Sequence, residues 1–127
     1  MDIIWKATIQ GQPTSKSNSQ WVKIVHRGPK SYGQIIKSTA AKKYMLQFED
    51  EIRVKKLKPK TPIEVDVKLT VWFFYESRRP DLDDSQLSDC LQYCEIIKND
   101  RQIKEKHLYH GLSKTNPRAV IILQPLT

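Results

Sequence analysis

The sequence predicts an α+β, or mixed α/β, fold with one small sheet and two main helices packed against it. Three observations predict this fold. A length of 127 residues suits one domain and nearly excludes a second. Several short stretches alternate apolar and polar residues, as half-buried strands do, and two longer stretches repeat apolar residues every three or four positions, as helices do. The expected order is strand, hairpin, helix, strand, helix and two final strands.

The first third of the chain is expected to form strands. Residues 3–10 alternate as a strand does, and residues 11–20 are polar and rich in turn formers, so they predict a loop. Residues 21–25 and 34–37 are strand-like and flank a stretch that contains Gly and Pro. This arrangement predicts a hairpin.

A helix is expected over residues 38 to about 56, with Ser38 as its N-cap. Glu51 and Lys55 have the i,i+4 spacing of an ion pair on the solvent side of this helix. Three large residues lie four apart and predict its buried face: Tyr44, Phe48 and Ile52.

The second half begins with the clearest strand of the chain, residues 63–75, in which alternating residues lead into a bulky aromatic end. A second helix of about twelve residues is expected after the loop 77–84. Its apolar stripe consists of Leu87, Leu91, Cys94 and Ile97. Residues 103–112 and 118–126 predict the two final strands.

Charge is unevenly distributed along the chain. Residues 1–60 carry 13 Lys and Arg against 4 Asp and Glu, whereas residues 61–127 carry 9 against 10. A basic surface beside an acidic cluster is typical of a metal-dependent nuclease, because Lys and Arg attract phosphates and carboxylates hold the cations that cleavage needs. The alternative is a solubilising surface. A chain of this length buries somewhat more than about 60% of its unfolded surface, so we also expect homodimerisation.

The sequence predicts neither a membrane span nor an export signal. The longest strictly apolar runs have five residues, far fewer than the roughly 18 that a bilayer requires. The two cysteines, Cys90 and Cys94, are too few and too close together for a secreted disulfide framework. We therefore expect a soluble protein of a reducing cytoplasm, with no membrane partner.

Three aspartates predict a metal site. Asp81 and Asp83 are two apart, so their carboxylates point the same way on an extended segment, and Pro80 ends strand pairing just before them. Close carboxylates repel unless a cation lies between them, and Mg²⁺ prefers such oxygen ligands. Asp100 follows the second helix, where we expect the chain to have returned to the same end of the sheet. Alternatively, Asp83 or Asp84 caps the helix and Asp100 begins a turn.

Two other patterns carry less weight. A spacing close to that of a zinc finger joins four residues: Cys90, Cys94, His107 and His110. The cysteines fall on the apolar stripe of a helix, however, and two histidines three apart on a strand point to opposite faces, so we expect core cysteines. Among the tryptophans, Trp21 lies beside a polar basic loop, where it could stack on a nucleic-acid base.

The residues around the acids resemble a known family. The chain reads R-R-P-D-L-D-D from residue 78, then D-C-L from residue 89 and N-D-R-Q-I from residue 99. This series resembles the RusA-type Holliday junction resolvases, whose motif reads D-L-D-N, then D-A-L, then D-D-x-Q-I. The opening I-Q-G-Q-P-T-S-K-S-N is also similar to that family, and the order of elements agrees over essentially the whole chain.

The resemblance implies one RusA-like nuclease domain over residues 1–127 that works as a homodimer. It implies a bacterial or phage-encoded enzyme that binds four-way and other branched DNA and nicks two opposing strands, in recombination and repair, with Mg²⁺ or Mn²⁺ as cofactor. The family's three metal-binding, catalytic aspartates match Asp81, Asp83 and Asp100. Asp89 matches a further family acid. Seven basic residues are expected to bind DNA: Lys16, Lys42, Lys43, Arg78, Arg79, Lys98 and Arg101.

The chain departs from the family pattern near the acids. The stretch that leads into the second helix is two residues shorter, Asp84 stands where the family has Asn, and Asn99 replaces the first acid of D-D-x-Q-I. The family's lysine, which assists the phosphate or the water, falls on Leu87, and we expect that side chain to pack inward. Lys98 or Lys16 is the expected substitute for the missing lysine.

The missing lysine leaves two other functions open. One is a junction-binding or DNA-binding protein of the same fold with weakened catalysis, and the other is a basic protein-interaction domain. A metal-dependent nicking assay on a synthetic junction separates the nuclease from both.

Overall fold

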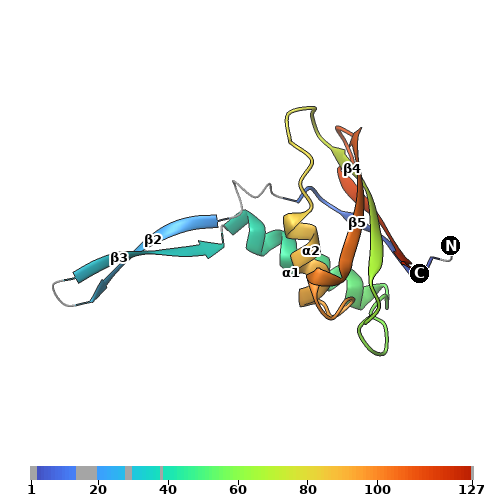
Figure 1. The fold of residues 1–127 in the computed structure, drawn as a ribbon. Coiled ribbons are helices and arrows are strands. Elements are labelled where there is room, and N and C mark those ends of the chain that lie inside the picture. Colours follow the sequence, from blue (N-terminus) through green and yellow to red (C-terminus); the bar gives the residue numbers. More distant parts are fainter. Residues whose placement is uncertain (1–2, 14–19, 28–29, 38, 127) are drawn as a thin grey trace.

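The computed structural model describes residues 3–13, 20–27, 30–37 and 39–126, and between residues 20 and 37 it describes the backbone alone. The body of the molecule is a four-stranded sheet with two helices on one of its faces (Figure 1). The α+β fold expected from the sequence is therefore confirmed. None of the helices in these ranges is both long and apolar enough to cross a membrane.

The sheet has the strand order β1-β6-β4-β5. Its strands are β1 (Trp5–Gln10), β6 (Arg118–Pro125), β4 (Val67–Tyr75) and β5 (Ile103–Leu112). β6 pairs antiparallel with both β1 and β4, whereas β4 and β5 pair in parallel. A parallel pair needs a crossover connection, and helix α2 (Ser85–Tyr93) provides it.

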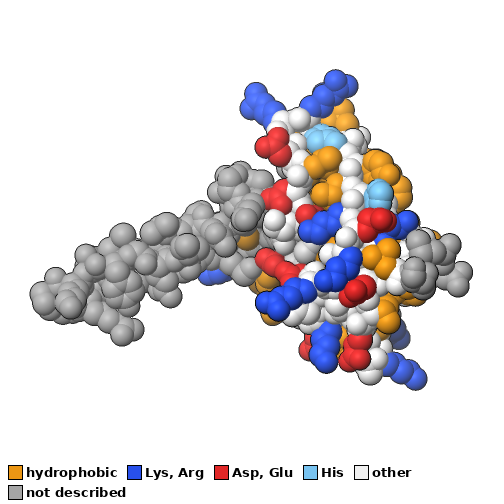
Figure 2. Space-filling model, in the orientation of Figure 1, with side chains coloured by type: hydrophobic (Ala, Val, Ile, Leu, Met, Phe, Trp, Pro, Cys, Tyr) orange, Lys and Arg blue, Asp and Glu red, His pale blue; other side chains and the backbone are white. Residues whose placement is uncertain are grey.

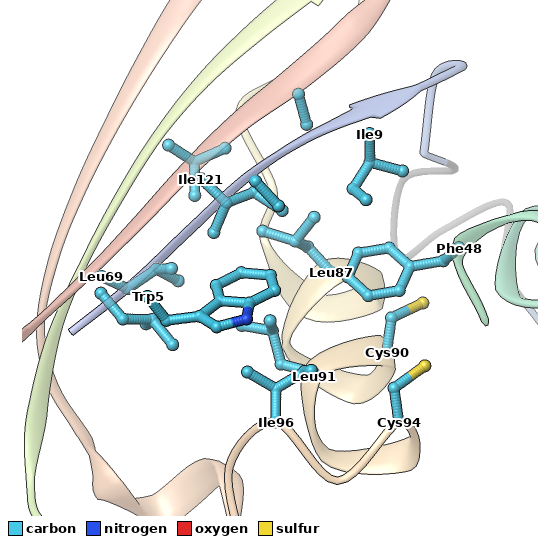
Figure 3. Packing of buried hydrophobic residues seen from close by; sticks show 14 of the residues in the cluster. Trp5, Ile9, Phe48, Leu69, Leu87, Cys90, Leu91, Cys94, Ile96 and Ile121 are labelled. Carbon is cyan, nitrogen blue, oxygen red and sulfur yellow. The ribbon is translucent and has the colours of Figure 1, made fainter. Parts of the chain in front are cut away.

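The core lies between this sheet and the helices. On β4 every second residue is buried, as the strict alternation in the sequence predicts. In Figure 3, Leu87 and Leu91 project from α2 toward the sheet, and Cys90 and Cys94 project toward α1. All four side chains are buried, which confirms the inward packing expected for Leu87.

Helix α1 spans Thr39–Val54. The face predicted to be buried is buried, and Lys55 Nζ lies 3.0 Å from Glu51 Oε1, as the spacing of these residues predicts. The expected N-cap, Ser38, lies outside the described residues. Gln47 and Lys55 each donate a hydrogen bond to a carbonyl of β1, at 2.5 and 2.9 Å, and so join this helix to the sheet edge.

Two boundaries differ from the expected ones. β4 begins four residues later, because the preceding segment pairs elsewhere. Ile63 forms an isolated parallel bridge with Ile97, and the side-chain amide of Gln102 donates to the carbonyls of Ile63 and Val65. α2 spans nine residues instead of about twelve, since the chain turns at Glu95, whose φ of 60° is left-handed.

The predicted hairpin is present and consists of β2 (Gln20–Arg27) and β3 (Lys30–Lys37). The two strands pair antiparallel along their whole length and form a two-stranded sheet beside the four-stranded one. In Figure 1 the hairpin projects away from the helices and the main sheet. Because β3 ends two residues before α1 begins, the base of the hairpin adjoins the start of α1.

Candidate functional site

Residues 81–84, the acidic segment, join the loop after β4 to the start of α2 and lie against β5. The Tyr75 hydroxyl at the end of β4 donates a long hydrogen bond of 3.4 Å to the Asp81 carbonyl. His110 Nε2, on β5, lies 3.0 Å from the Pro80 carbonyl oxygen. The Tyr75 and His110 rings contact each other, with centroids 4.6 Å apart. These two rings therefore hold the acidic segment at the β4–β5 edge of the sheet.

The Tyr75 hydroxyl lies close to two of the predicted acids. Burial raises the pKa of Tyr75 to about 12, and the carboxylates of Asp83 and Asp81 contribute to the rise because a phenolate beside them would be repelled. The hydroxyl therefore stays protonated, and can donate to the segment, to a higher pH than an ordinary tyrosine would.

Asp83 stabilises the first turn of α2. Its Oδ1 accepts hydrogen bonds from the Ser85 backbone N–H at 3.0 Å and from the Ser85 hydroxyl at 2.7 Å. These bonds form a local turn before the helix and orient the carboxylate. The N-cap residue of α2 is Asp84, whose side chain makes no capping hydrogen bond, so the capping alternative is not confirmed for either acid. Asp81 is exposed and Asp83 is half-buried. The structure thus brings these two predicted acids together in one segment, beside one tyrosine.

Asp84 is buried and paired. Its Oδ2 accepts from the Ser88 hydroxyl at 2.8 Å and lies 2.9 Å from Lys106 Nζ. The sequence alone does not single out Lys106, on β5, because nothing local relates a strand residue to an acid 22 positions earlier. One signal in the sequence could have revealed Lys106. It alternates with Leu108 and His110, so the three side chains are expected on one face of the strand at residues 103–112.

Asp100 lies apart from the other two predicted ligands. Its backbone N–H donates to Gln92 Oε1 at 2.9 Å, at the opposite end of α2 from Asp83. The nine residues of α2 make a helix roughly 13 Å long, so its two ends are separated by about that length. The expectation that Asp100 returns to the same end of the sheet is wrong, because β4 and β5 are parallel and the start of β5 lies beside the start of β4.

Within the described ranges, no three His, Cys, Asp or Glu side chains gather closely enough to hold a metal ion. This observation does not test the metal assignment, so Asp81, Asp83 and Asp100 remain predicted ligands. Asp89, the further family acid, is exposed on α2.

The predicted DNA-binding residues fall into two groups. Arg78 and Arg79 are exposed just before the acidic segment, and basic side chains extend from this loop in Figure 2. Lys42 and Lys43 are exposed in the first turns of α1. The Gln86 amide donates to the Ala41 carbonyl at 2.8 Å and so joins the start of α1 to the start of α2, beside the acids.

The second group lies near Asp100. Arg101 is exposed in the short 3₁₀ turn Asp100–Gln102, and its backbone N–H donates to the Asn99 side chain at 2.9 Å. Lys98 is exposed and its Nζ lies 3.6 Å from Glu64 Oε1. Lys16, the other expected substitute for the family lysine, lies outside the described residues.

The structure supports the interpretation of the cysteines as core residues. Both are buried free thiols, and burial together with the Glu49 carboxylate raises the pKa of Cys94 to about 11. His107 and His110 lie on opposite faces of β5, since the first pairs in register with Thr70 and the second with Phe73. The Trp21 side chain, the possible base-stacking group, lies outside the described part of the chain.

The sequence model of the family described as endodeoxyribonuclease RusA matches residues 10–124. A search of curated proteins found no match. The matched range includes the acidic segment, both helices, Asp100 and Lys106.

Proposed function

Because the chain belongs to the RusA endodeoxyribonuclease family, we propose that it is a Mg²⁺-dependent enzyme that cuts four-way DNA junctions during recombination and repair. Family membership supports an endodeoxyribonuclease in general. The finer proposal rests on the acidic segment, in which Asp81 and Asp83 lie near one tyrosine hydroxyl and follow the exposed Arg78 and Arg79. Phosphodiester hydrolysis requires carboxylates that hold a cation and basic groups that bind phosphate.

The acidic segment has the donor chemistry that suits Mg²⁺, or Mn²⁺ in its place. Proteins commonly bind Mg²⁺ through one or two carboxylates and leave the other positions to water and phosphate oxygens. Asp81 and Asp83 offer these two carboxylates. When bound, the ion would activate a water and neutralise charge on the cleaved phosphate. We retain Asp100 as a proposed third ligand and test it separately, because α2 lies between it and the other two.

The chain's own residues orient the acids and bind the substrate. Ser85 fixes the direction of the Asp83 carboxylate, and Tyr75 holds the backbone of Asp81. The exposed Lys and Arg beside them would bind phosphates on either side of the cut. A two-fold homodimer presents two such sites, which fits the two opposing strands of a junction. We place this dimer in the cytoplasm of a bacterium, encoded by the host or by a phage.

The hairpin supports a long DNA contact. Residues 3–48 contain no Asp or Glu, so the hairpin and the start of α1 belong to an uninterrupted basic part of the sequence. The base of the hairpin adjoins the start of α1, which Gln86 joins to the start of α2. A basic arm that begins beside the acids is suited to hold a DNA strand across the site.

One observation favours a second candidate function. Leu87, at the position of the family's lysine, is fully buried. A family member without that cation could bind junctions and cut them slowly or not at all. The second candidate is therefore a junction-binding protein with weakened catalysis.

The test is nicking of a synthetic four-way junction under single-turnover conditions, in Mg²⁺ and in EDTA. Asp81→Asn, Asp83→Asn and Asp100→Asn are each expected to abolish cleavage. Junction binding in EDTA should persist or tighten, because each change removes a charge that repels phosphate. Asp50→Asn, which alters an exposed acid on α1, is the matched control and should cleave like wild type.

Each outcome has one meaning. A variant that nicks like wild type at saturating Mg²⁺ removes its residue from the metal site. A wild-type chain that binds junctions in EDTA but nicks them in neither Mg²⁺ nor Mn²⁺ supports the second candidate. A chain that does not bind junctions at all contradicts both.

A further inference from the structure

Lys106 faces the helices, not the open side of the sheet. The β4–β5 register shifts between Val67 and Lys68, so that Lys106 pairs with Leu69, and Leu69 is fully buried on the helix-facing side. Side chains paired in register on parallel strands point to the same face. The contact between His110, four residues further on, and buried Tyr75 agrees with this direction. The ammonium group is therefore directed toward the segment that joins β4 to α2.

The ammonium group is anchored there and is still accessible. Lys106 Nζ lies 2.9 Å from Asp84 Oδ2, and the Asp84 side chain is 13% exposed whereas that of Lys106 is 46% exposed. Asp84 is itself held by the Ser88 hydroxyl. A lysine has three N–H donors, and a single carboxylate oxygen occupies one of them. The others can reach a phosphate that approaches from solvent.

We propose that Lys106 binds the scissile phosphate at the candidate active site, an inference that rests on the proposed nuclease function. Negative charge accumulates on the phosphate during hydrolysis, and a cation already held in place stabilises it without reorganisation. Lys98 is a poorer candidate, because it pairs with Glu64 near Asp100, at the far end of α2 from the acidic segment. The buried Leu87 contributes no charge.

The same pair accounts for two departures from the family pattern. A lysine at position 87 would need to bury its ammonium group in the core, so the cation has to come from another element. Asp84, where the family has Asn, supplies the carboxylate that fixes a lysine from β5 beside the acids. The buried Leu87 and the carboxylate of Asp84 therefore both favour a cation that comes from β5.

A simple Lys106→Met variant would leave Asp84 buried without its cation and could unfold for that reason. The decisive comparison is therefore made in an Asp84→Asn background, where the amide oxygen has two lone pairs, can accept from both the Ser88 hydroxyl and the Lys106 ammonium group and so keeps Lys106 in place, and no buried carboxylate remains. Lys104→Met, an exposed lysine two residues earlier on the same strand, is the control. Urea unfolding checks that every variant is folded under assay conditions.

Two measurements follow: the single-turnover nicking rate in saturating Mg²⁺, and the salt dependence of junction binding in EDTA. Asp84→Asn/Lys106→Met should cleave about 100-fold more slowly than Asp84→Asn. The slope of log K against log salt should fall in magnitude by about 0.9, the value for one lost phosphate contact. Lys104→Met should nick within about twofold of wild type.

If the double variant cleaves and binds like Asp84→Asn, Lys106 merely neutralises Asp84 and the inference is overturned, while the nuclease function stands. If the wild-type chain does not nick, the salt dependence of junction binding still tests whether Lys106 contacts a phosphate. A slope reduced by loss of Lys106 supports the phosphate contact although the nuclease function has failed. An unchanged slope overturns the inference.

Discussion

Gln102 is expected to be the most important polar side chain for the stability of the α2–β5 connection. It is 9% exposed and makes three hydrogen bonds. Its amide donates to the carbonyls of Ile63 and Val65 at 2.7 and 2.9 Å, and its Oε1 accepts from the Asn99 backbone N–H at 2.8 Å. These bonds tie the segment before β4 to the segment that carries Asp100. We predict that Gln102→Ala destabilises the fold, because it removes the bonds to the segment before β4 and the bond to Asn99.

The magnitude follows from the three bonds. Each contributes about 0.5–1.5 kcal/mol, so their combined loss is worth about 1.5–4.5 kcal/mol. The lower half of that range applies, because Val65 is 54% exposed. Water can therefore donate to the Val65 carbonyl in place of the lost Gln102 amide. We expect a loss of about 1.5–3 kcal/mol in the free energy of unfolding, or a fall in Tm of about 6–12 °C for a domain of this size.

The assay is urea unfolding of Gln102→Ala beside Gln92→Ala. Gln92 is an exposed glutamine of α2 whose side chain accepts one hydrogen bond, from the Asp100 backbone N–H, so its loss should cost under about 1 kcal/mol. The reasoning would be refuted if the free energy of unfolding of Gln102→Ala lay within about 0.5 kcal/mol of that of wild type. It would also be refuted if both variants lost the same free energy of unfolding.

Gln102→Glu tests the direction of the bonds. A carboxylate cannot donate to the two carbonyls, whereas a protonated carboxyl group can donate to one of them. The folded state should therefore raise the pKa of the new side chain above its ordinary value of about 4.3. Its destabilisation relative to wild type should be smallest below that value and should grow as the pH rises through the folded-state pKa. A pH-independent difference would contradict the geometry.

Three further predictions follow from the same structure. Leu87→Lys should destabilise the fold by a few kcal/mol in urea unfolding without raising the nicking rate, because Leu87 is fully buried; a stable, faster variant would contradict this. Lys42→Ala/Lys43→Ala should flatten the salt dependence of junction binding, whereas an unchanged slope would place α1 away from DNA. Because the pKa of Tyr75 is raised to about 12, the free energy of unfolding should fall between pH 10 and 12, and Tyr75→Phe should reduce that fall in urea titrations.

The elements of this fold are predictable where their signals are local. The alternation that ends at Tyr75 and the four-residue repeat of Tyr44, Phe48 and Ile52 each lie within one element, and the structure confirms both. The early part of the expected fourth strand fails for a non-local reason. Gln102, almost forty residues away, takes the carbonyls of Ile63 and Val65 that strand pairing would have used. Nothing within residues 63–66 indicates that competition.

The candidate site is predictable only in part, for the same reason. Asp81 and Asp83 are recognised because they are near in sequence and lie in one extended segment. Lys106 and His110 join them only through the pairing of β5 with β4, which places two strands that are 27 residues apart in the chain side by side. Residue spacing alone carries no information about that register.

The direction of this pairing decides which side chains share the site. In an antiparallel pair, the start of β5 would lie beside the end of β4, and Asp100 would adjoin Asp81. In the parallel pair, the later part of β5 lies there instead and brings His110 to the acidic segment, while Lys106, the fourth residue of β5, reaches Asp84 from beside Leu69. Asp100 lies beyond the other end of α2. The length of the connection is the signal that favours the parallel arrangement. Hairpins join strands through a few residues, whereas 27 residues that include a helix are typical of a crossover between parallel strands.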